Sequence, residues 1–187
     1  MPTLLNDLLF VLWFFLPAGL ANMMPILVAR LPLLKKLDFP LDCYATFRHK
    51  RVFGSHKTIR GFLSGILAGI LTTYLQVFLY SRVPFIQSFV SIDYTTLNAW
   101  LFGLLASGGA LTGDALRSFF KRQMDIAPGK TWFPFDQLDY IIGGVLFTVF
   151  YIQLTLWQYL LLFAIWFLLH PLSTFIGYQL KLKESPI

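Results

Sequence analysis

The stretch LLNDLLFVLWFFLPAGLANMMPILVARL, residues 4–31, is apolar over a length that can cross a lipid bilayer. No Lys or Arg precedes it, and it is too long for the apolar region of a secretory signal peptide. Pro17 and Pro25 interrupt it on either side of Asn22, so we expect a kinked or broken helix. Such an interruption is tolerated where neighbouring protein or a wet cavity satisfies the freed backbone groups. The stretch predicts an integral membrane protein.

The composition of the whole chain supports this fold class. The chain has 187 residues, of which 57% are hydrophobic and 13% are charged, whereas a soluble domain carries about 25% charged residues. This surplus of apolar side chains exceeds what one small core can bury, so lipid must solvate much of it. We expect a single membrane-embedded domain over residues 1–187. Cys43 is the only cysteine, which excludes an intramolecular disulfide.

Five apolar spans can be drawn, which predicts an all-α membrane protein of about five transmembrane helices. The second span carries Gly61, Gly65 and Gly69 at four-residue spacing, a pattern that lets another helix approach closely. The last two spans are separated by a short segment and should form a helical hairpin. The spans are 4–30, 60–80, 96–120, 137–154 and 157–180.

The charge distribution predicts the orientation of these spans. With five spans, fourteen of the fifteen Lys and Arg residues fall on one face of the membrane, and only Arg82 falls on the other. The positive-inside rule makes that face cytoplasmic, with the N-terminus outside and the C-terminus in the cytoplasm. The net charge of +6 is therefore carried between apolar spans. This placement indicates contact with anionic lipid headgroups and phosphorylated substrates, and not with nucleic acid.

Asp114 lies near the cytoplasmic end of the third span. A carboxylate at the centre of a membrane helix costs roughly 2.5–3.5 kcal/mol on insertion scales, so it usually faces a polar cavity and has a partner. Ser118 and Lys121 follow at i+4 and i+7 on the same helix face, with Arg122 beside them. A helix end with Lys and Arg reaching to the headgroups would explain the two basic residues, but not the deeper carboxylate.

Asp136 and Asp139 lie at the mouth of the fourth span. Carboxylates three residues apart on a helix project to one side, close enough to share a divalent cation. Mg²⁺ is held mainly by carboxylate oxygens together with substrate phosphates. The alternative is that Asp136 is an N-cap or first-turn residue stabilised by the helix dipole. That alternative does not account for Asp139, so we expect a metal site.

A third polar element, FGSHKTIRG at residues 53–61, precedes the second span. Its Lys57 and Arg60, near a helix N-terminus and flanked by glycines, would suit phosphate oxygens. Taken alone, the element equally fits a basic juxtamembrane segment that touches lipid headgroups. It lacks the glycine and lysine spacing of a P-loop.

Taken in order, these elements resemble the CDP-archaeol synthase family, which is related to bacterial phosphatidate cytidylyltransferases. The resemblance covers nearly the whole chain, and it departs from the wider group at Arg117, where a Glu is common, and at Ser173-Thr174, where the family tail commonly has Asn. The matching pieces are PAGLANMMP at 17–25, FGSHKTIRG at 53–61, GD at 113–114, SFFKR at 118–122, PG at 128–129, DQLD at 136–139 and the tail from His170 through Gly177 to Pro186.

The resemblance implies an enzyme of the cytoplasmic membrane that transfers CMP from CTP to a lipid phosphate and releases pyrophosphate. The lipid would be archaetidic-acid-like, 2,3-bis-O-geranylgeranylglycerol 1-phosphate, with the active site on the cytoplasmic side. The resemblance leaves open whether the enzyme forms a homodimer. The resemblance also implies roles for individual residues. Mg²⁺ would be held by Asp114, Asp136 and Asp139, and phosphates would be bound by Lys57, Thr58, Arg60, Ser118, Lys121 and Arg122.

Other functions share some of these sequence features. An intramembrane carboxylate also occurs in small ion or solute transporters, but the halves of the chain show no inverted repeat and the acidic residues gather on one face. A polyprenol kinase-like enzyme would share the phosphate chemistry. A CDP-alcohol phosphotransferase would carry an Asp-Gly-x-x-Ala-Arg motif, which the sequence lacks. A non-catalytic assembly factor would have no need of Asp114 and Asp139.

Overall fold

The computed structural model describes residues 3–29, 31, 35–127 and 130–179, and it is mostly helical, which confirms the all-α class. Arg30, Lys181, Lys183 and the PG and tail motifs beyond Gln179 lie outside the described residues. The helices are α1 (Leu4–Ala29), η1 (Lys35–Leu37), α2 (Ile59–Arg82), α3 (Pro84–Phe89), α4 (Ala99–Gln123), α5 (Phe135–Thr148) and α6 (Leu156–Gln179), and a two-stranded hairpin is formed by β1 (Thr46–Phe47) and β2 (Lys50–Arg51).

Three of the described helices, α1, α2 and α6, are long and apolar enough to cross a membrane. Helix α4 has 25 residues, about 37 Å, but its second half carries several charges. Helix α5 is shorter than expected. It begins at Phe135 and ends at Thr148, and its 14 residues span about 21 Å, less than the roughly 30 Å of a bilayer core. The protein is thus a helical membrane protein with three candidate spans, and the count of five stays a prediction.

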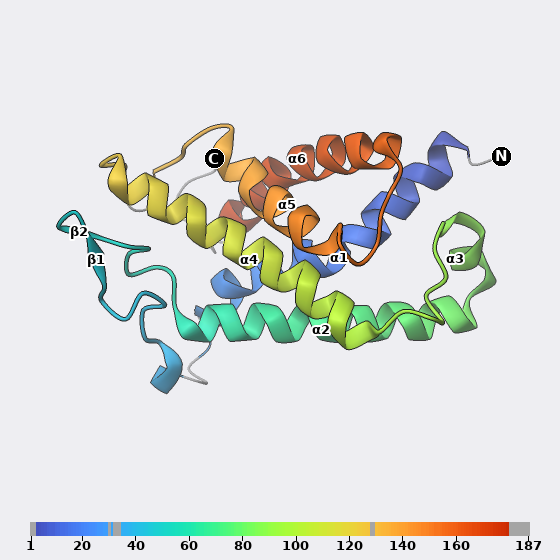
Figure 1. Ribbon diagram of the computed structural model, residues 1–187, viewed down its shortest axis with the longest axis horizontal. Coiled ribbons are helices and arrows are strands. Elements are labelled where there is room, and N and C mark those ends of the chain that lie inside the picture. The colour runs from blue at the N-terminus through green and yellow to red at the C-terminus, as the bar shows by residue number, and fades with distance from the viewer. Residues whose placement is uncertain (1–2, 30, 32–34, 128–129, 180–187) are drawn as a thin grey trace.

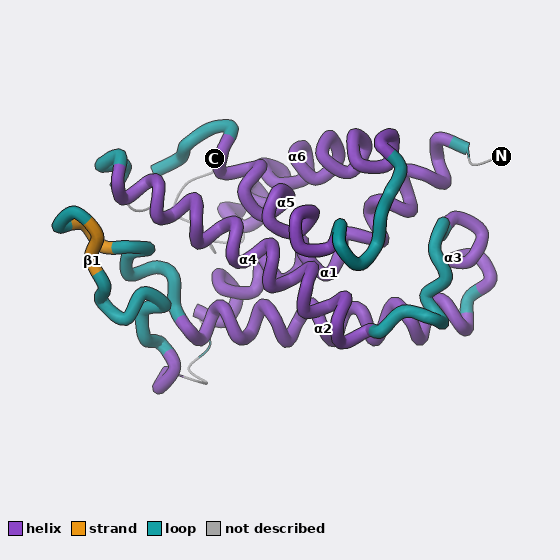
Figure 2. The backbone as a smooth tube through the Cα atoms, in the orientation of Figure 1, coloured by secondary structure: helices purple, strands orange, loops and turns teal. Residues whose placement is uncertain are grey.

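The helices run side by side and alternate in direction (Figure 1). The beginning of α2, the end of α4 and the β1–β2 hairpin lie at the left end of the molecule, and α3 and the start of α1 lie at the right. Figure 2 shows that helices form the body of the molecule and that the loop and strands of residues 38–58, between η1 and α2, stand at the left end. The basic residues of 35–60 and of 117–130 therefore gather at one end, as the charge distribution predicts.

Helix α1 is one continuous helix with Pro17 and Pro25 inside it, so the expected break is wrong and the expected kink stays a prediction. A proline has no N–H, and Pro17 therefore leaves the carbonyl of Trp13 without its helical partner. The Gln76 side chain of α2 supplies one: its Nε2 donates to Trp13 O at 2.5 Å. A neighbouring helix thus satisfies the freed backbone group, as membrane helices require.

The glycine face of α2 packs against α1 and α4, as its spacing predicts. A Cβ at Gly61 would lie 2.9 Å from the Pro25 side chain, and one at Gly65 would lie 2.8 Å from Ala21 O. Neither distance leaves room for a methyl group, so α1 and α2 pack closely at these two glycines. The opposite face of α2 exposes Leu63, Leu67, Leu71, Leu75 and Phe78, where lipid would solvate them.

The core lies where α1, α4, α5 and α6 meet. Phe10, Phe14 and Phe15 of α1 are fully or almost fully buried there. The indole of Trp166 donates to Val11 O at 3.2 Å, and the Tyr140 hydroxyl donates to Trp166 O at 2.8 Å. These bonds tie α6 to α1 and to α5, and they fix α5 against the rest of the molecule.

Candidate functional site

The candidate site begins at the contact between α4 and α5, which cross as antiparallel neighbours through Gly109, Gly113 and Gly143. A Cβ at Gly113 would lie 2.9 Å from the carbonyl carbon of Asp139 and 3.2 Å from the Cα of Gly143, and it would come closer still to the Asp139 carbonyl oxygen. Only glycine permits this approach. The contact places Asp114, the next residue of α4, beside Asp139 of α5.

Three carboxylates meet around the guanidinium of Arg117 in this contact. Its Nη2 pairs with Asp114 Oδ1 and its Nη1 with Asp136 Oδ1. Its Nε lies 2.7 Å from Asp139 Oδ2; this pair is ionic and not aligned as a hydrogen bond, and neither atom has a hydrogen-bond partner among the described residues. We call Asp114, Asp136, Asp139 and Arg117 the carboxylate cluster. It was Asp114, Asp136 and Asp139 that the sequence singled out, and the structure brings them together.

Two lysines complete the charge balance of the carboxylate cluster. Lys57 Nζ pairs with Asp114 Oδ2. Lys121 Nζ lies 3.1 and 3.3 Å from the two oxygens of Asp136 and also donates to the carbonyl of Lys130. Three cations therefore face three carboxylates in a largely buried site. A buried charge needs such pairing, because desolvation of an unpaired charge is costly.

Backbone groups hold the carboxylates in place. Trp132 N donates to Asp136 Oδ2 at 2.7 Å, and Tyr140 N donates to Asp139 Oδ1 at 2.5 Å. Asp136 is thus a first-turn residue of α5 and a member of the cluster at once. The Ser118 hydroxyl donates to the backbone oxygen of Asp114 at 3.0 Å and does not reach the carboxylates.

Asp42 organises the loop that carries Lys57, a role that the sequence did not suggest. It accepts hydrogen bonds from Arg51 Nε and Nη2 at 3.2 and 2.5 Å, and from the backbone N–H groups of Phe53 and Gly54, each at 3.0 Å. Burial raises the pKa of Asp42, but these donors together outweigh it and lower the pKa to about 2. Asp42 is therefore ionised at any physiological pH.

The same loop is fixed at its other end by backbone pairing. Leu41 N donates to Lys57 O at 2.7 Å, next to an antiparallel bridge between Pro40 and Thr58. Gly54 has a φ of +88°, the left-handed region that favours glycine. The Arg122 side chain lies 3.5 Å from the position that a Cβ of Gly54 would take. Arg122 is thus placed against the loop, near the carboxylate cluster.

Two residues predicted to bind phosphate have other partners. The Thr58 hydroxyl caps α2 by accepting from Gly61 N at 3.2 Å. Arg60 of α2 is 4% exposed. Its side chain reaches the segment after α1, where it donates to Leu31 O at 3.4 Å and pairs with Asp38 at 3.2 Å. The structure therefore does not bring Arg60 into the carboxylate cluster.

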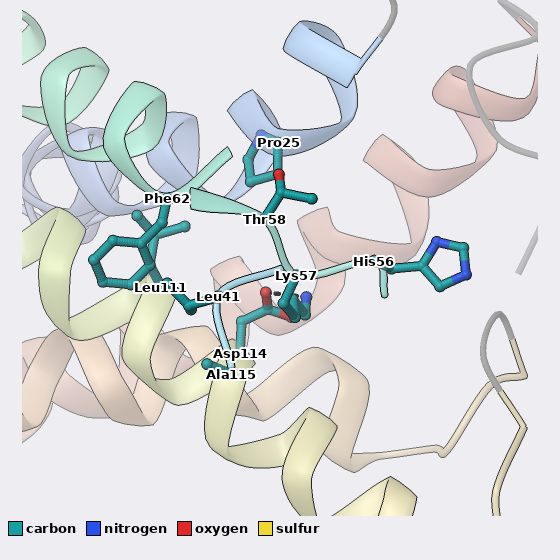
Figure 3. A pocket seen from close by; sticks show the side chains of 9 residues that line it. All are labelled: Pro25, Leu41, His56, Lys57, Thr58, Phe62, Leu111, Asp114 and Ala115. Carbon is teal, nitrogen blue, oxygen red and sulfur yellow. Dashed lines mark hydrogen bonds and ion pairs between the residues drawn. The ribbon is translucent and has the colours of Figure 1, made fainter. Parts of the chain in front are cut away.

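A small cavity of about 20 Å³ opens beside the Lys57–Asp114 pair, room for little more than one water molecule. Figure 3 shows the Lys57 ammonium next to the Asp114 carboxylate, with His56 directed away. The other walls are mostly apolar. The lining residues are Pro25, Leu41, His56, Lys57, Thr58, Phe62, Leu111, Asp114 and Ala115. The cavity thus places the charged Lys57–Asp114 pair beside apolar side chains.

The donor set fits a hard divalent cation. Carboxylate oxygens are the ligands that Mg²⁺ prefers, and the three carboxylates already surround a positive group, the Arg117 guanidinium. Within the described ranges no three His, Cys, Asp or Glu residues converge closely enough to hold a metal ion as they stand. The carboxylates are spread around the planar guanidinium, and they would have to close on a smaller ion.

Known proteins resemble the chain along its whole length. A family model described as CarS-like CDP-archaeol synthase matches residues 4–187. The CDP-archaeol synthase of Methanospirillum hungatei is 35% identical over 145 residues, 73% of this chain and 82% of the relative. That of Pyrococcus furiosus is 28% identical over 183 residues, 97% of this chain and 99% of the relative.

A solved structure of similar fold belongs to an intramembrane enzyme for archaeal membrane lipids biosynthesis. It has a TM-score of 0.70 and 24% sequence identity, and the match covers 89% of this chain and 93% of that chain. At this identity the likeness shows the fold alone, a helical one.

Proposed function

Because the chain belongs to the CDP-archaeol synthase family, we propose that it transfers CMP from CTP to an archaeal lipid phosphate, giving a CDP-lipid and pyrophosphate. The family match over residues 4–187 carries this proposal. The carboxylate cluster supports it, because a buried group of acids and bases beside an apolar surface suits the joining of a nucleotide to a lipid. Polyprenol kinase and transporter activities are not favoured.

The reaction can be written with balanced atoms. An oxygen of the lipid phosphate attacks the α-phosphorus of CTP, and a new P–O bond forms. The bond between the α-phosphorus and the oxygen that bridges to the β-phosphorus breaks, and pyrophosphate leaves with that oxygen. The lipid phosphate is already an oxyanion near neutral pH, so the step needs no strong general base. It needs positioning and charge neutralisation.

The protein would supply both. We propose that Asp114, Asp136 and Asp139 hold Mg²⁺, which when bound would neutralise negative charge on the triphosphate. Lys57, Lys121 and Arg122 would bind phosphate oxygens and stabilise the leaving pyrophosphate. Thr58 and Arg60 would act indirectly, because each already serves the local structure at the start of α2.

The cluster would face the cytoplasm, where CTP is made. It lies at the end of the molecule that gathers the basic residues, and the positive-inside rule assigns that end to the cytoplasm. We also propose that residues 1–187 act as one membrane-embedded domain, since α1 contacts each of α2, α4, α5 and α6.

A transfer assay with purified protein tests this function and its substrate class. The protein is incubated with labelled CTP and Mg²⁺, and with lipid phosphates that differ only in their chains: ether-linked isoprenoid or ester-linked acyl. We expect label in the ether-lipid product, loss of transfer in excess EDTA and recovery with added Mg²⁺. Undiminished transfer in EDTA would refute the metal assignment, and transfer to the ester-linked lipid alone would refute the archaeal substrate.

A further inference from the structure

Arg117 occupies the centre of the carboxylate cluster. All three of its nitrogens contact a carboxylate, and each contacts a different one. Its side chain is only 17% exposed. A planar guanidinium offers donors in several fixed directions, whereas a lysine offers one compact ammonium. Arg117 therefore fixes the positions of three carboxylates that would otherwise repel one another.

This arrangement places a metal ion and Arg117 in competition. Asp114, Asp136 and Asp139 are the oxygen donors proposed for Mg²⁺, and each now contacts Arg117. A metal that takes these oxygens releases the guanidinium into a largely buried site without an anion. A buried charge that loses its partner is strongly destabilising. Metal without nucleotide should therefore bind weakly.

The nucleotide would remove this penalty. Its triphosphate brings several negative oxygens beside the metal, and arginine pairs with phosphate through two parallel N–H donors. We propose that Arg117 is a placeholder cation. It fills the carboxylate cluster when nucleotide is absent and moves onto the triphosphate when metal enters, so that metal and CTP bind cooperatively. This inference rests on the proposed function, which supplies the nucleotide.

The test measures metal binding and not turnover. Mn²⁺ replaces Mg²⁺ because free Mn²⁺ can be titrated by electron paramagnetic resonance. The nucleotide is α,β-methylene-CTP, whose α–β bridge cannot be broken. The proteins are the full-length parent and two variants. Arg117→Met keeps the length of the side chain and removes its charge, and Arg117→Lys keeps the charge but lacks the planar guanidinium. Arg82→Met is the matched control, since Arg82 is the last residue of α2, at the opposite end of the molecule.

For the parent and Arg82→Met, we expect weak Mn²⁺ binding alone and binding at least ~10-fold tighter with the analogue. Arg117→Met should bind Mn²⁺ alone at least ~10-fold more tightly than the parent, because no cation has to be displaced. In this variant the analogue should tighten Mn²⁺ binding by less than about 3-fold. Arg117→Lys should lie between the two. Mn²⁺ also binds nucleotide in solution, so the gain is compared between variants at identical concentrations.

A thermal melt keeps the inference testable if Arg117→Met is unstable. In EDTA its midpoint should fall below that of the parent by at least ~4 °C, because three carboxylates then share two lysines, and Mn²⁺ alone should restore it. Unchanged or weaker Mn²⁺ affinity in Arg117→Met, or a lowered midpoint that Mn²⁺ fails to restore, overturns the placeholder role. If the parent itself fails to bind the analogue, the proposed function fails instead.

Discussion

Replacing Gly113 by alanine tests whether the close contact of α4 and α5 builds the site. The added Cβ would lie 2.9 Å from the carbonyl carbon of Asp139 and 3.2 Å from the Cα of Gly143. Carbon atoms in van der Waals contact are about 3.5–4.0 Å apart. Both neighbours are backbone atoms, so no side chain can turn aside, and the two helices must separate by about 1 Å.

That separation sets the expected effect. Overpacking a tight contact costs about 1–3 kcal/mol of stability. The catalytic loss should be larger, because Asp114 and Asp139 lie on opposite sides of the contact and would move apart. A misplacement of about 1 Å in a catalytic constellation costs on the order of 10²-fold in rate. Gly113→Ala should therefore lose about 10²-fold of CMP transfer while it still folds.

Gly108→Ala is the matched control on the same helix. A Cβ at Gly108 meets no atom within 4 Å, and alanine favours a helix over glycine by up to about 1 kcal/mol. Its transfer rate should equal that of the parent, and its thermal midpoint should be equal or higher. Both variants are assayed for CMP transfer and checked by gel filtration in detergent. A folded Gly113→Ala protein with the parental rate would show that the α4–α5 contact does not set the site geometry.

Three further predictions concern single side chains. Asp139→Asn should reduce CMP transfer by at least ~10²-fold, roughly 2.7 kcal/mol of transition-state stabilisation. Asp93→Asn, in the exposed connection between α3 and α4, should keep a transfer rate within a few-fold of the parent. A folded and active Asp139→Asn protein would show that Asp139 is not a metal ligand. Cys43, an exposed thiol, should resist an impermeant maleimide in right-side-out vesicles until they are permeabilised, and labelling before that step would reverse the orientation. Asp42→Asn should raise the KM for CTP by about 10-fold, because Lys57 loses its loop support. Since the pKa of Asp42 is lowered from 3.8 to about 2, its stabilising effect should be full above about pH 4 and lost as the pH falls through 2; a midpoint difference between parent and variant that is unchanged at low pH would contradict this.

The sequence was sufficient for the helices and for the members of the cluster that lie close together in the chain. Apolar length predicts α1, α2 and α6 to within a few residues, because a membrane imposes one period and one length on its helices. The i, i+3 spacing places Asp136 and Asp139 on one side of α5 without tertiary information. The glycine spacing of α2 likewise predicts its close packing.

The sequence was insufficient for site residues whose positions depend on contacts between distant parts of the chain. In the sequence, Arg117 stands out only as a departure from the cytidylyltransferase pattern, although its i+3 spacing from Asp114 is a usable local signal. Its contacts with Asp136 and Asp139 depend on the helix crossing at Gly113, which no local pattern specifies. Asp42 gave no signal at all, since its partners, Arg51, Phe53 and Gly54, meet it only through the fold of the loop.

One helix boundary and one helix interruption were also beyond the sequence. Hydropathy extends the fourth span to residue 154, but α5 ends at Thr148. The overestimate arises because hydropathy gives an apolar residue the same value in a turn as in a helix. The prolines of α1 suggested a break, yet the helix is continuous. Its freed carbonyl at Trp13 finds a donor in Gln76, 63 residues away in the chain.

The central claim is that the chain moves a cytidylyl group and not a phosphoryl group. The most direct test incubates purified protein, Mg²⁺ and an ether-lipid phosphate with CTP labelled at either the α- or the γ-phosphorus. We predict that α-label appears in the lipid product and that γ-label appears only in pyrophosphate. Transfer of γ-label to the lipid would identify a kinase, and an absence of label from the lipid in both reactions would contradict the proposed function.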